Sequence, residues 1–177
     1  PYSEDSSKDL PGHKIPDKWD DGEWITVGEQ QAVIIVGRIA LGEIRYGEPL
    51  PGDCDQNKGY HGDPYQPAIL FYDPTDLATV ARGEKQPWEV LPYARWNPEA
   101  HLFPSCEWYL TGAAYDAEHA LLYLVQSDAD RETNEFEPYP LIHVFRVQAA
   151  NEEPVETHTI YLPLLYKPTG ALELVNK

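Results

Sequence analysis

The amino-acid sequence predicts an all-β fold, made of two four-stranded antiparallel sheets of the kind that form the blades of a β-propeller. Short runs rich in Val, Ile, Leu, Tyr and Phe recur along the 177 residues, and Gly, Pro, Asp or Asn bounds most of them. These runs fall into two sets of four that share their order. Four antiparallel strands repeated along a chain are typical of propeller blades.

The chain divides into an arm, two blades and a tail. Residues 1–22 are polar, contain several prolines and show no hydrophobic period, so we expect an extended arm or linker. Within the β-rich region 23–164, the blades are expected over 23–98 and 107–164, and residues 165–177 form a C-terminal tail. The expected strands are 23–28, 31–41, 67–74, 89–96, 109–116, 120–127, 140–148 and 155–164.

One helix is expected at 75–84, "TDLATVARGE", between the third and fourth strands of the first set. Thr75 or Asp76 can cap its N-terminus with a side-chain oxygen, and Gly83 can end it. This helix is therefore a connection between two strands of one sheet.

The two sets align with each other. "AVIIV" at 32–36 matches "ALLYL" at 120–124, and "PAILF" at 67–71 matches "PLIHV" at 140–144. The first set differs by a longer loop, 42–66, between its second and third strands. Because propellers usually contain four or more blades, we expect missing sequence or other protein chains to complete this one. An eight-stranded β-sandwich is the alternative of suitable size.

The composition restricts the partners. Lys and Arg number 13 against 30 Asp and Glu, a formal charge of -17. Such a field repels nucleic acid and anionic lipid surfaces, and it suits cations, basic proteins or neutral sugars. No apolar run approaches the length of a membrane span. We therefore expect neither a nucleic-acid partner nor a transmembrane segment.

The cysteine content favours an exported protein. The chain starts at Pro1 and contains no Met, so we expect a processed chain or a fragment. Its two cysteines, Cys54 and Cys106, match no zinc-site spacing. One disulfide in a secreted, periplasmic or cell-surface protein fits this pattern, and two separate buried thiols are the alternative.

Three loops are expected to share one face of the two blades. In a blade, the loop between strands two and three lies on the same face as the link to the next blade. Loop 42–66 carries Cys54 and link 97–108 carries Cys106, so a disulfide between them is geometrically possible. The second blade contributes loop 127–140 to this face. Candidate ligand-face residues are Tyr60, His61, His101, Trp108, Asp128 and Asp130, with ordinary solvated loops as the alternative.

The stretch "GDCDQNKGYHGD", residues 52–63, predicts a calcium site of irregular type. Hard cations bind several oxygens, and alternating Asp and Asn side chains can surround one ion. An EF-hand is excluded, since Lys58 replaces the turn glycine and Pro64 occupies position twelve. The expected calcium ligands are Asp53, Asp55, Asn57 and Asp63. His61 and His101 offer nitrogen ligands for a transition metal instead.

A catalytic role is the competing hypothesis. Glycoside hydrolysis needs two carboxyl groups about 5–10 Å apart on either side of the bond that breaks. Glu107, beside Trp108, and Asp55, brought near by the cysteines, form the candidate pair. The alternative function is therefore a propeller-type glycoside hydrolase or polysaccharide lyase. His143 lies between apolar neighbours on a strand and is expected to be a hydrogen-bonded core histidine.

Long motifs carry a family resemblance. They are "ILFYDPTDLATVARGEKQPWEVLPYA" (69–94), "TGAAYDAEHALLYLVQ" (111–126) and "PLIHVFRV" (140–147). Over roughly residues 23–148, the chain resembles the C-terminal portion of a family of exported bacterial β-propeller-like proteins whose activity is uncharacterised. The resemblance implies export, a propeller fold and a longer parent chain, and it implies no activity. With the residue patterns, it predicts an exported acidic binding or scaffold protein, with calcium or carbohydrate as small partners.

Overall fold

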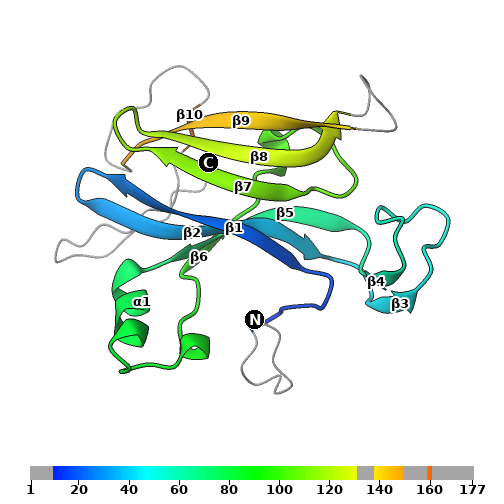
Figure 1. The fold of residues 1–177 in the computed structure, drawn as a ribbon, viewed down its shortest axis with the longest axis horizontal. Helices are drawn as coiled ribbons and strands as arrows, with labels where there is room; N and C mark the ends of the chain where they lie inside the picture. The colour runs from blue at the N-terminus through cyan, green and yellow to red at the C-terminus, as the bar shows by residue number, and fades with distance from the viewer. Residues whose placement is uncertain (1–9, 131–137, 150–158, 161–177) are drawn as a thin grey trace.

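The computed structural model describes residues 10–130, 138–149 and 159–160 (Figure 1). It confirms an all-β protein with antiparallel sheets, each of them open. Two sheets face each other across one core, an arrangement that a sandwich and a pair of blades share. The expected tail, 165–177, lies outside the described residues.

The first sheet follows chain order. Its second strand is the clearest consequence of sequence pattern, because alternate residues Ala32, Ile34 and Val36 are completely buried. A tight turn with Gly28 at φ 58° reverses the chain from the first strand into the second. The order is β1 (Lys18–Val27), β2 (Gln30–Ala40), β5 (Tyr65–Tyr72) and β6 (Ala94–Trp96), all antiparallel.

The first strand begins at Lys18, inside the segment expected to be an arm. Two contacts explain this. A Cβ at Gly37 would lie 1.9 Å from the Lys18 carbonyl oxygen, so glycine permits the close approach of the two strands. The Asp17 carboxylate also accepts a hydrogen bond from the Ala40 amide at 2.7 Å. The boundary of the arm therefore moves from residue 22 to before Lys18.

The second sheet corrects one expectation. Its strands are β7 (Leu110–Asp116), β8 (Leu121–Asp130), β9 (Tyr139–Val147) and β10 (Thr159–Ile160). The first three are antiparallel, but β10 pairs in parallel with Arg146 and Val147. A fourth strand therefore lies within the expected range 155–164, at the two residues of it that the structure describes, but the expected antiparallel pairing is wrong. The intervening sequence, 148–158, contains no two-residue hairpin signal such as Asn-Gly, and a long connection permits parallel pairing.

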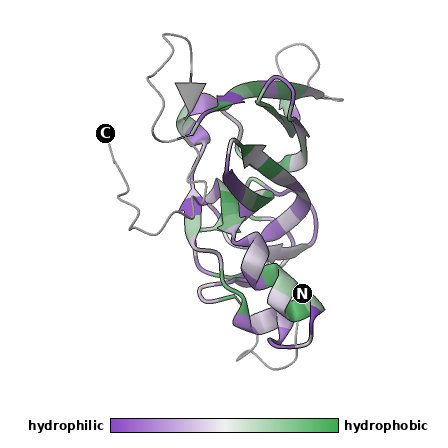
Figure 2. Ribbon diagram, turned by 90° about the vertical axis from the view of Figure 1, so that its left-hand side faces the viewer, coloured by the Kyte–Doolittle hydropathy of each residue, from purple (hydrophilic) through white to green (hydrophobic). Residues whose placement is uncertain are grey.

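The core lies between the two sheets. Trp96 of β6 meets Phe145 of β9 edge to face, with ring centroids 5.8 Å apart. Hydrophobic and hydrophilic residues alternate along several strands (Figure 2), as expected for sheets with one buried face. The fully packed residues are Ile25, Ala32, Ile34, Val36, Ile69 and Phe71 from the first sheet, and Leu102, Leu110, Leu122, Leu124, Phe145 and Val147 from the second half.

The first strands of the two sheets lie next to each other. The Asp21 carboxylate of β1 accepts a hydrogen bond from the Ala113 amide of β7 at 3.0 Å. The Glu23 carboxylate accepts another from the Tyr115 amide at 3.3 Å, and the Tyr115 hydroxyl donates to the Thr26 carbonyl at 2.7 Å. Side chains of β1 therefore satisfy backbone groups at the free edge of β7.

The connections complete the fold. The helix expected at 75–84 is present as α1 (Pro74–Ala81), on the side of the first sheet that faces away from the second (Figure 1). Asp73, two residues before the expected cap Thr75, caps it by accepting from the Thr75 amide at 2.7 Å, and Gly83 follows at φ 72°. Loop 42–66 contains a small hairpin that the sequence did not indicate, β3 (Arg45–Gly47) and β4 (Gly59–His61). Short 3₁₀ turns occupy Pro87–Glu89 and Glu99–His101.

Within the described part of the chain, no helix is long and apolar enough to cross a membrane.

Candidate functional site

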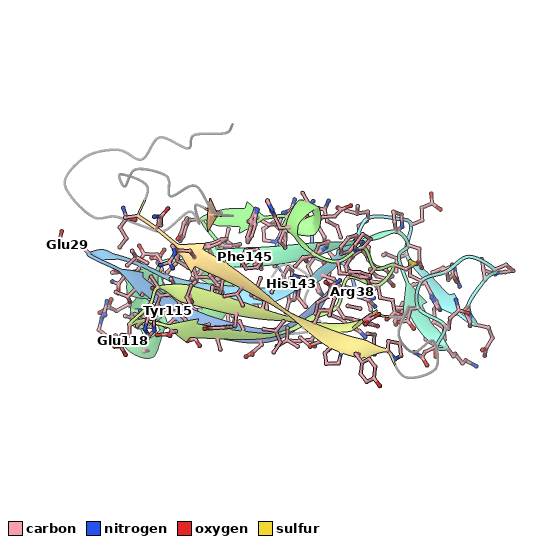
Figure 3. The ribbon with its side chains drawn as sticks, turned by 90° about the horizontal axis from the view of Figure 1, so that it is seen from above. Glu29, Arg38, Tyr115, Glu118, His143 and Phe145 are labelled. Carbon is pink, nitrogen blue, oxygen red and sulfur yellow. A yellow bond between two sulfur atoms is a disulfide. The ribbon has the colours of Figure 1, made fainter. Side chains whose placement is uncertain are left out.

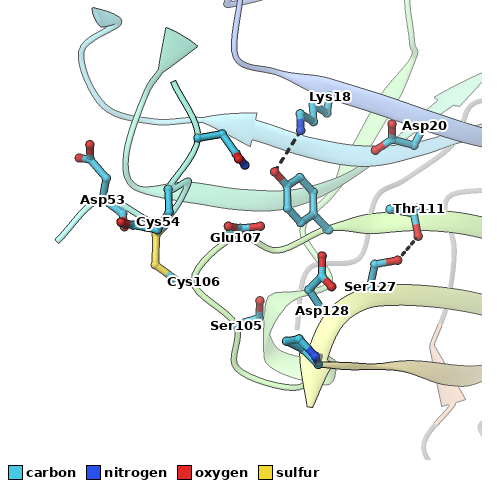
Figure 4. Close-up of a pocket in the computed structure, with 14 residues that line it drawn as sticks. Lys18, Asp20, Asp53, Cys54, Ser105, Cys106, Glu107, Thr111, Ser127 and Asp128 are labelled. Carbon is cyan, nitrogen blue, oxygen red and sulfur yellow. Dashed lines mark hydrogen bonds between the residues drawn. A yellow bond between two sulfur atoms is a disulfide. The ribbon is translucent and has the colours of Figure 1, made fainter. Parts of the chain in front are cut away.

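A disulfide between Cys54 and Cys106 fixes the candidate site (Figure 4). The two Cα atoms are 5.3 Å apart and 52 positions apart in the sequence. The bond joins loop 42–66 to the link between the sheets, so the predicted pairing is confirmed. It holds the β3–β4 hairpin at one end of the two sheets.

A polar pocket of about 860 Å³ opens beside this disulfide, and we call it the cystine pocket. Its walls come from β1, loop 42–66, the link before β7, and β8. The charged side chains that line it are Asp20, Asp53, Glu107, Asp128 and Lys18. The hydroxyl groups are those of Ser105, Tyr109, Thr111 and Ser127. The pocket is therefore acidic, with one lysine at its edge.

Arg38 supports the pocket from inside the fold. Only 1% of this residue is exposed, and its guanidinium lies between the rings of Tyr65 and Tyr109, 3.8 and 3.9 Å from their centroids. Nη1 donates to the Glu107 carbonyl at 2.9 Å, and Nη2 lies 3.5 Å from an Asp55 carboxylate oxygen. A planar cation stacked between two rings holds both of them in place. Figure 3 shows Arg38 well away from Glu29 and Glu118, which lie at the other end of the sheets.

Tyr109 links Arg38 to the pocket. Its hydroxyl accepts a hydrogen bond from Lys18 Nζ at 3.0 Å, drawn as a dashed line in Figure 4. Burial raises the pKa of Tyr109, and the hydrogen bond with the Glu107 side chain acts in the same direction, against the opposing charge of Arg38. The phenol therefore stays neutral across the physiological range. This one hydroxyl therefore forms hydrogen bonds with both the Lys18 amine and the Glu107 side chain.

Among the expected calcium ligands, Asp55 contacts Asn57 and turns toward Arg38, apart from Asp53 and Asp63. Partial burial raises its pKa, but hydrogen bonds from the Asn57 amide and side chain and the charge of Arg38 outweigh that effect. The pKa of Asp55 is consequently below its usual value. The two Asn57 nitrogens both lie 3.0 Å from the same Asp55 oxygen. Asp53 and Asp63 instead gather around His61, with one ligand atom of each residue within 4.8 Å of the others.

The predicted ligand-face residues separate into different environments. Asp128 lines the cystine pocket, whereas Trp108 packs against the edge of the core. Tyr60 lies on the surface against Tyr46, with ring centroids 4.9 Å apart. His101 packs against Trp96 at 6.1 Å, and Asp130 pairs with Tyr139 within the second sheet.

His143 lies within the second sheet, as the sequence predicted. Its Nε2 lies 2.9 Å from the Gln126 side-chain oxygen, and the ring stacks on Phe145. Burial lowers the pKa of His143, so the ring is neutral near pH 7. A neutral, hydrogen-bonded histidine of this kind is a structural residue.

Two carboxylates of the pocket have no partner among the residues that the structure describes. Asp20 on β1 and Asp128 on β8 are exposed, and neither makes a hydrogen bond or ion pair with any residue that the structure describes. Asp128 adopts φ 52°, which places it at a local irregularity of its strand. Asp20, Lys18 and Arg38 were not predicted from the sequence. Arg38 could have been found, because it is a charged residue inside the apolar run 31–41.

Comparisons of the chain with protein-family models, with curated proteins and with solved structures gave no match.

Proposed function

We propose that this chain is an exported binding protein whose cystine pocket takes a ligand with a positively charged group. The observation that carries the proposal is a pair of exposed carboxylates, Asp20 and Asp128, that line one polar pocket and have no charged partner among the described residues. The chain's formal charge of -17 adds a field that attracts cations toward it. The ligand class is a protonated amine or guanidinium, as on a basic peptide or an amino sugar. The disulfide supports export.

The pocket is built for binding without rearrangement. The disulfide fixes one wall, and Arg38 holds Tyr109 and the Glu107 backbone in another. A site whose groups are already held in place loses little conformational entropy when a ligand binds. The rigid walls therefore favour recognition of a small charged group over a large closing movement.

Binding accounts for the carboxylates better than hydrolysis does. A glycosidase needs one carboxylic acid whose pKa is raised, so that it can protonate the leaving group. Asp55 has a lowered pKa, because Asn57 and Arg38 stabilise its charged form. The Glu107 side chain is bound by the Tyr109 hydroxyl. Asp55 is thus a charged group stabilised by its neighbours, and Glu107 is held by a hydrogen bond.

Removing the negative charges of Asp20 and Asp128 is expected to weaken the binding of cationic probes. In Asp20→Asn plus Asp128→Asn, the affinity for penta-lysine or for a glucosamine oligomer falls about 10-fold, since each partly exposed ion pair contributes up to about 1 kcal/mol. Isothermal titration calorimetry at low ionic strength measures the loss. The two probes distinguish a peptide ligand from an amino-sugar ligand.

The matched control removes two charges at the other end of the sheets. Glu29→Gln plus Glu118→Gln alters net charge equally, and both residues lie far from Arg38 (Figure 3). This variant is expected to bind the probes nearly as well as the wild type. An equal loss in both variants would show that only overall charge matters, and it would remove the pocket as the site.

We also propose that the two sheets are neighbouring blades of an incomplete propeller. The supporting observation is an apolar outer face on the second sheet, where Ile142 and Val144 are 64% and 50% exposed. They pair across the strands with Val125 and Tyr123. In a propeller such a face packs against the next blade, and β1 and β7 lie side by side as innermost strands do. Missing sequence or other chains would cover this face.

Charging this face is expected to abolish self-association. Wild-type chain is expected to elute as an oligomer in size-exclusion chromatography with light scattering, because exposed apolar surface associates. Ile142→Lys plus Val144→Lys yields a folded monomer, whereas Tyr46→Lys, on an exposed hairpin residue, leaves association unchanged. A monodisperse, stable wild-type monomer would contradict the incomplete propeller and favour a self-contained sandwich.

A further inference from the structure

We infer that Asp53, His61 and Asp63 form a binding site for a divalent first-row transition-metal ion, a function beyond the proposed binding of cationic groups. One ligand atom from each residue lies within 4.8 Å of the other two. The three residues all lie in loop 42–66, with Asp53 before and His61 and Asp63 after the segment that carries Lys58. Two carboxylate oxygens and one imidazole nitrogen are a donor set that such ions prefer.

His61 supplies the observation that points to an ion. The residue is only 1% exposed, and its Nε2 lies 3.3 Å from the Gly47 carbonyl oxygen. A carbonyl accepts hydrogen bonds, so Nε2 carries a proton in this contact, and Nδ1 is the ring nitrogen that can bind an ion. Nδ1 is buried and has no hydrogen-bond partner within the described structure. Metal-bound histidines are commonly oriented in this way, by a carbonyl at the other ring nitrogen.

The spacing of the donors suits ligands of one ion better than a hydrogen bond. His61 Nδ1 and Asp53 Oδ2 are 3.7 Å apart, which is longer than a hydrogen bond. Ligand atoms about 2.0–2.1 Å from a tetrahedral ion lie about 3.4 Å from each other. The His61 ring and the Asp53 carboxylate are therefore close to the separation that two ligands of one ion require.

The Asp63 side chain, like the His61 ring, is oriented by a hydrogen bond with a backbone group. Its Oδ1 accepts a hydrogen bond from the Cys54 amide at 2.7 Å, which fixes the side chain next to the disulfide. Its Oδ2 is buried and lacks a hydrogen-bond partner among the residues described. An unpaired buried acceptor is costly, and a bound cation satisfies it.

Arg45 is the positive group that faces the cluster, and its Nη2 contacts Asp53 Oδ2. The Leu50 amide also donates to Asp53 Oδ2, so both lone pairs of this oxygen are in use, and an ion would bind the Asp53 carboxylate through its other oxygen, with the guanidinium as an outer partner. Two carboxylates and one guanidinium leave one net negative charge for a divalent cation. The imidazole nitrogen favours Zn²⁺ or Co²⁺ over Ca²⁺, which prefers oxygen ligands throughout.

The test uses metal-free full-length chain, titrated with Zn²⁺ by calorimetry and with Co²⁺ by visible absorption. We expect one ion per chain, Co²⁺ ligand-field bands, and a higher melting temperature with Zn²⁺ that chelator reverses. His61→Gln keeps a donor for the Gly47 carbonyl but removes the Nδ1 lone pair. Asp63→Asn keeps the acceptor for the Cys54 amide but removes the charge. Each lowers Zn²⁺ affinity by at least about 100-fold, as loss of a direct ligand should.

Asp55→Asn is the matched control, because it removes the same charge from the same loop outside the cluster. It is expected to keep Zn²⁺ affinity close to that of the wild type. Absence of Zn²⁺ binding by the wild type, or undiminished binding by either ligand variant, would overturn the inference. Equal weakening in Asp55→Asn, or Ca²⁺ binding as tight as Zn²⁺ binding, would do the same. Melting without metal shows whether each variant is folded, and the two ligand variants test the site independently.

Discussion

Replacing Arg38 with methionine is expected to lower the free energy of unfolding by about 3 kcal/mol, the typical loss when one partner of a buried charged pair is removed. The substitution deletes the hydrogen bond to the Glu107 carbonyl and the contact with Asp55. It also removes the cation held between the Tyr65 and Tyr109 rings. Denaturant unfolding followed by tryptophan fluorescence measures the change.

Arg95→Met is the matched control, because Arg95 is exposed on β6. A surface substitution of this kind changes stability by less than about 0.5 kcal/mol. Arg38→Lys is expected to fall between the two, since lysine keeps the charge but cannot stack or form a planar fork. If Arg38→Met were as stable as Arg95→Met, Arg38 would have no role in holding the pocket wall.

Removing the disulfide is expected to cost about 4 kcal/mol of stability, as the loop-closure model predicts for a cross-link of this span. Cys54→Ser plus Cys106→Ser leaves loop 42–66 tied to the link only by weaker contacts. The same variant should bind cationic probes less tightly, because one wall of the cystine pocket is then unfixed. Unfolding measurements and calorimetry on the same samples test both effects.

Cys54→Ala plus Cys106→Ala separates the cross-link from the side chains. If the cross-link is the cause, the serine and alanine variants lose stability equally, and reduced wild type resembles both. A reduced wild-type protein as stable as the oxidised one would contradict the loop-closure account.

Hydrophobic periodicity was sufficient to predict most of the sheet structure. Strand β2 alternates between buried and half-buried residues, so its face toward the core is encoded locally. Strand β1 was placed too late, because the pairing of Lys18 depends on a glycine at position 37 in another strand. The parallel pairing of β10 depends on where a long connection returns, which no local pattern records.

The candidate site was predicted in part. Position in the repeat was enough to bring Cys54 and Cys106 together, because loops of alternating hairpins share a face. It could not show that Asp55 turns toward Arg38, since that contact joins a loop to the interior of a strand. The grouping of Asp53 with His61 and Asp63 similarly requires the β3–β4 hairpin, whose three-residue strands carry no strong pattern.

The central claim is that the cystine pocket binds a cationic group, and amide chemical-shift mapping tests it most directly. Two-dimensional NMR of isotope-labelled chain, titrated with penta-lysine, reports which residues sense the ligand. The account predicts that the largest saturable shifts fall on Lys18, Asp20, Glu107, Tyr109 and Asp128, around the pocket. Shifts spread evenly over acidic surface residues, or centred on Glu29 and Glu118 at the other end of the sheets, would contradict it.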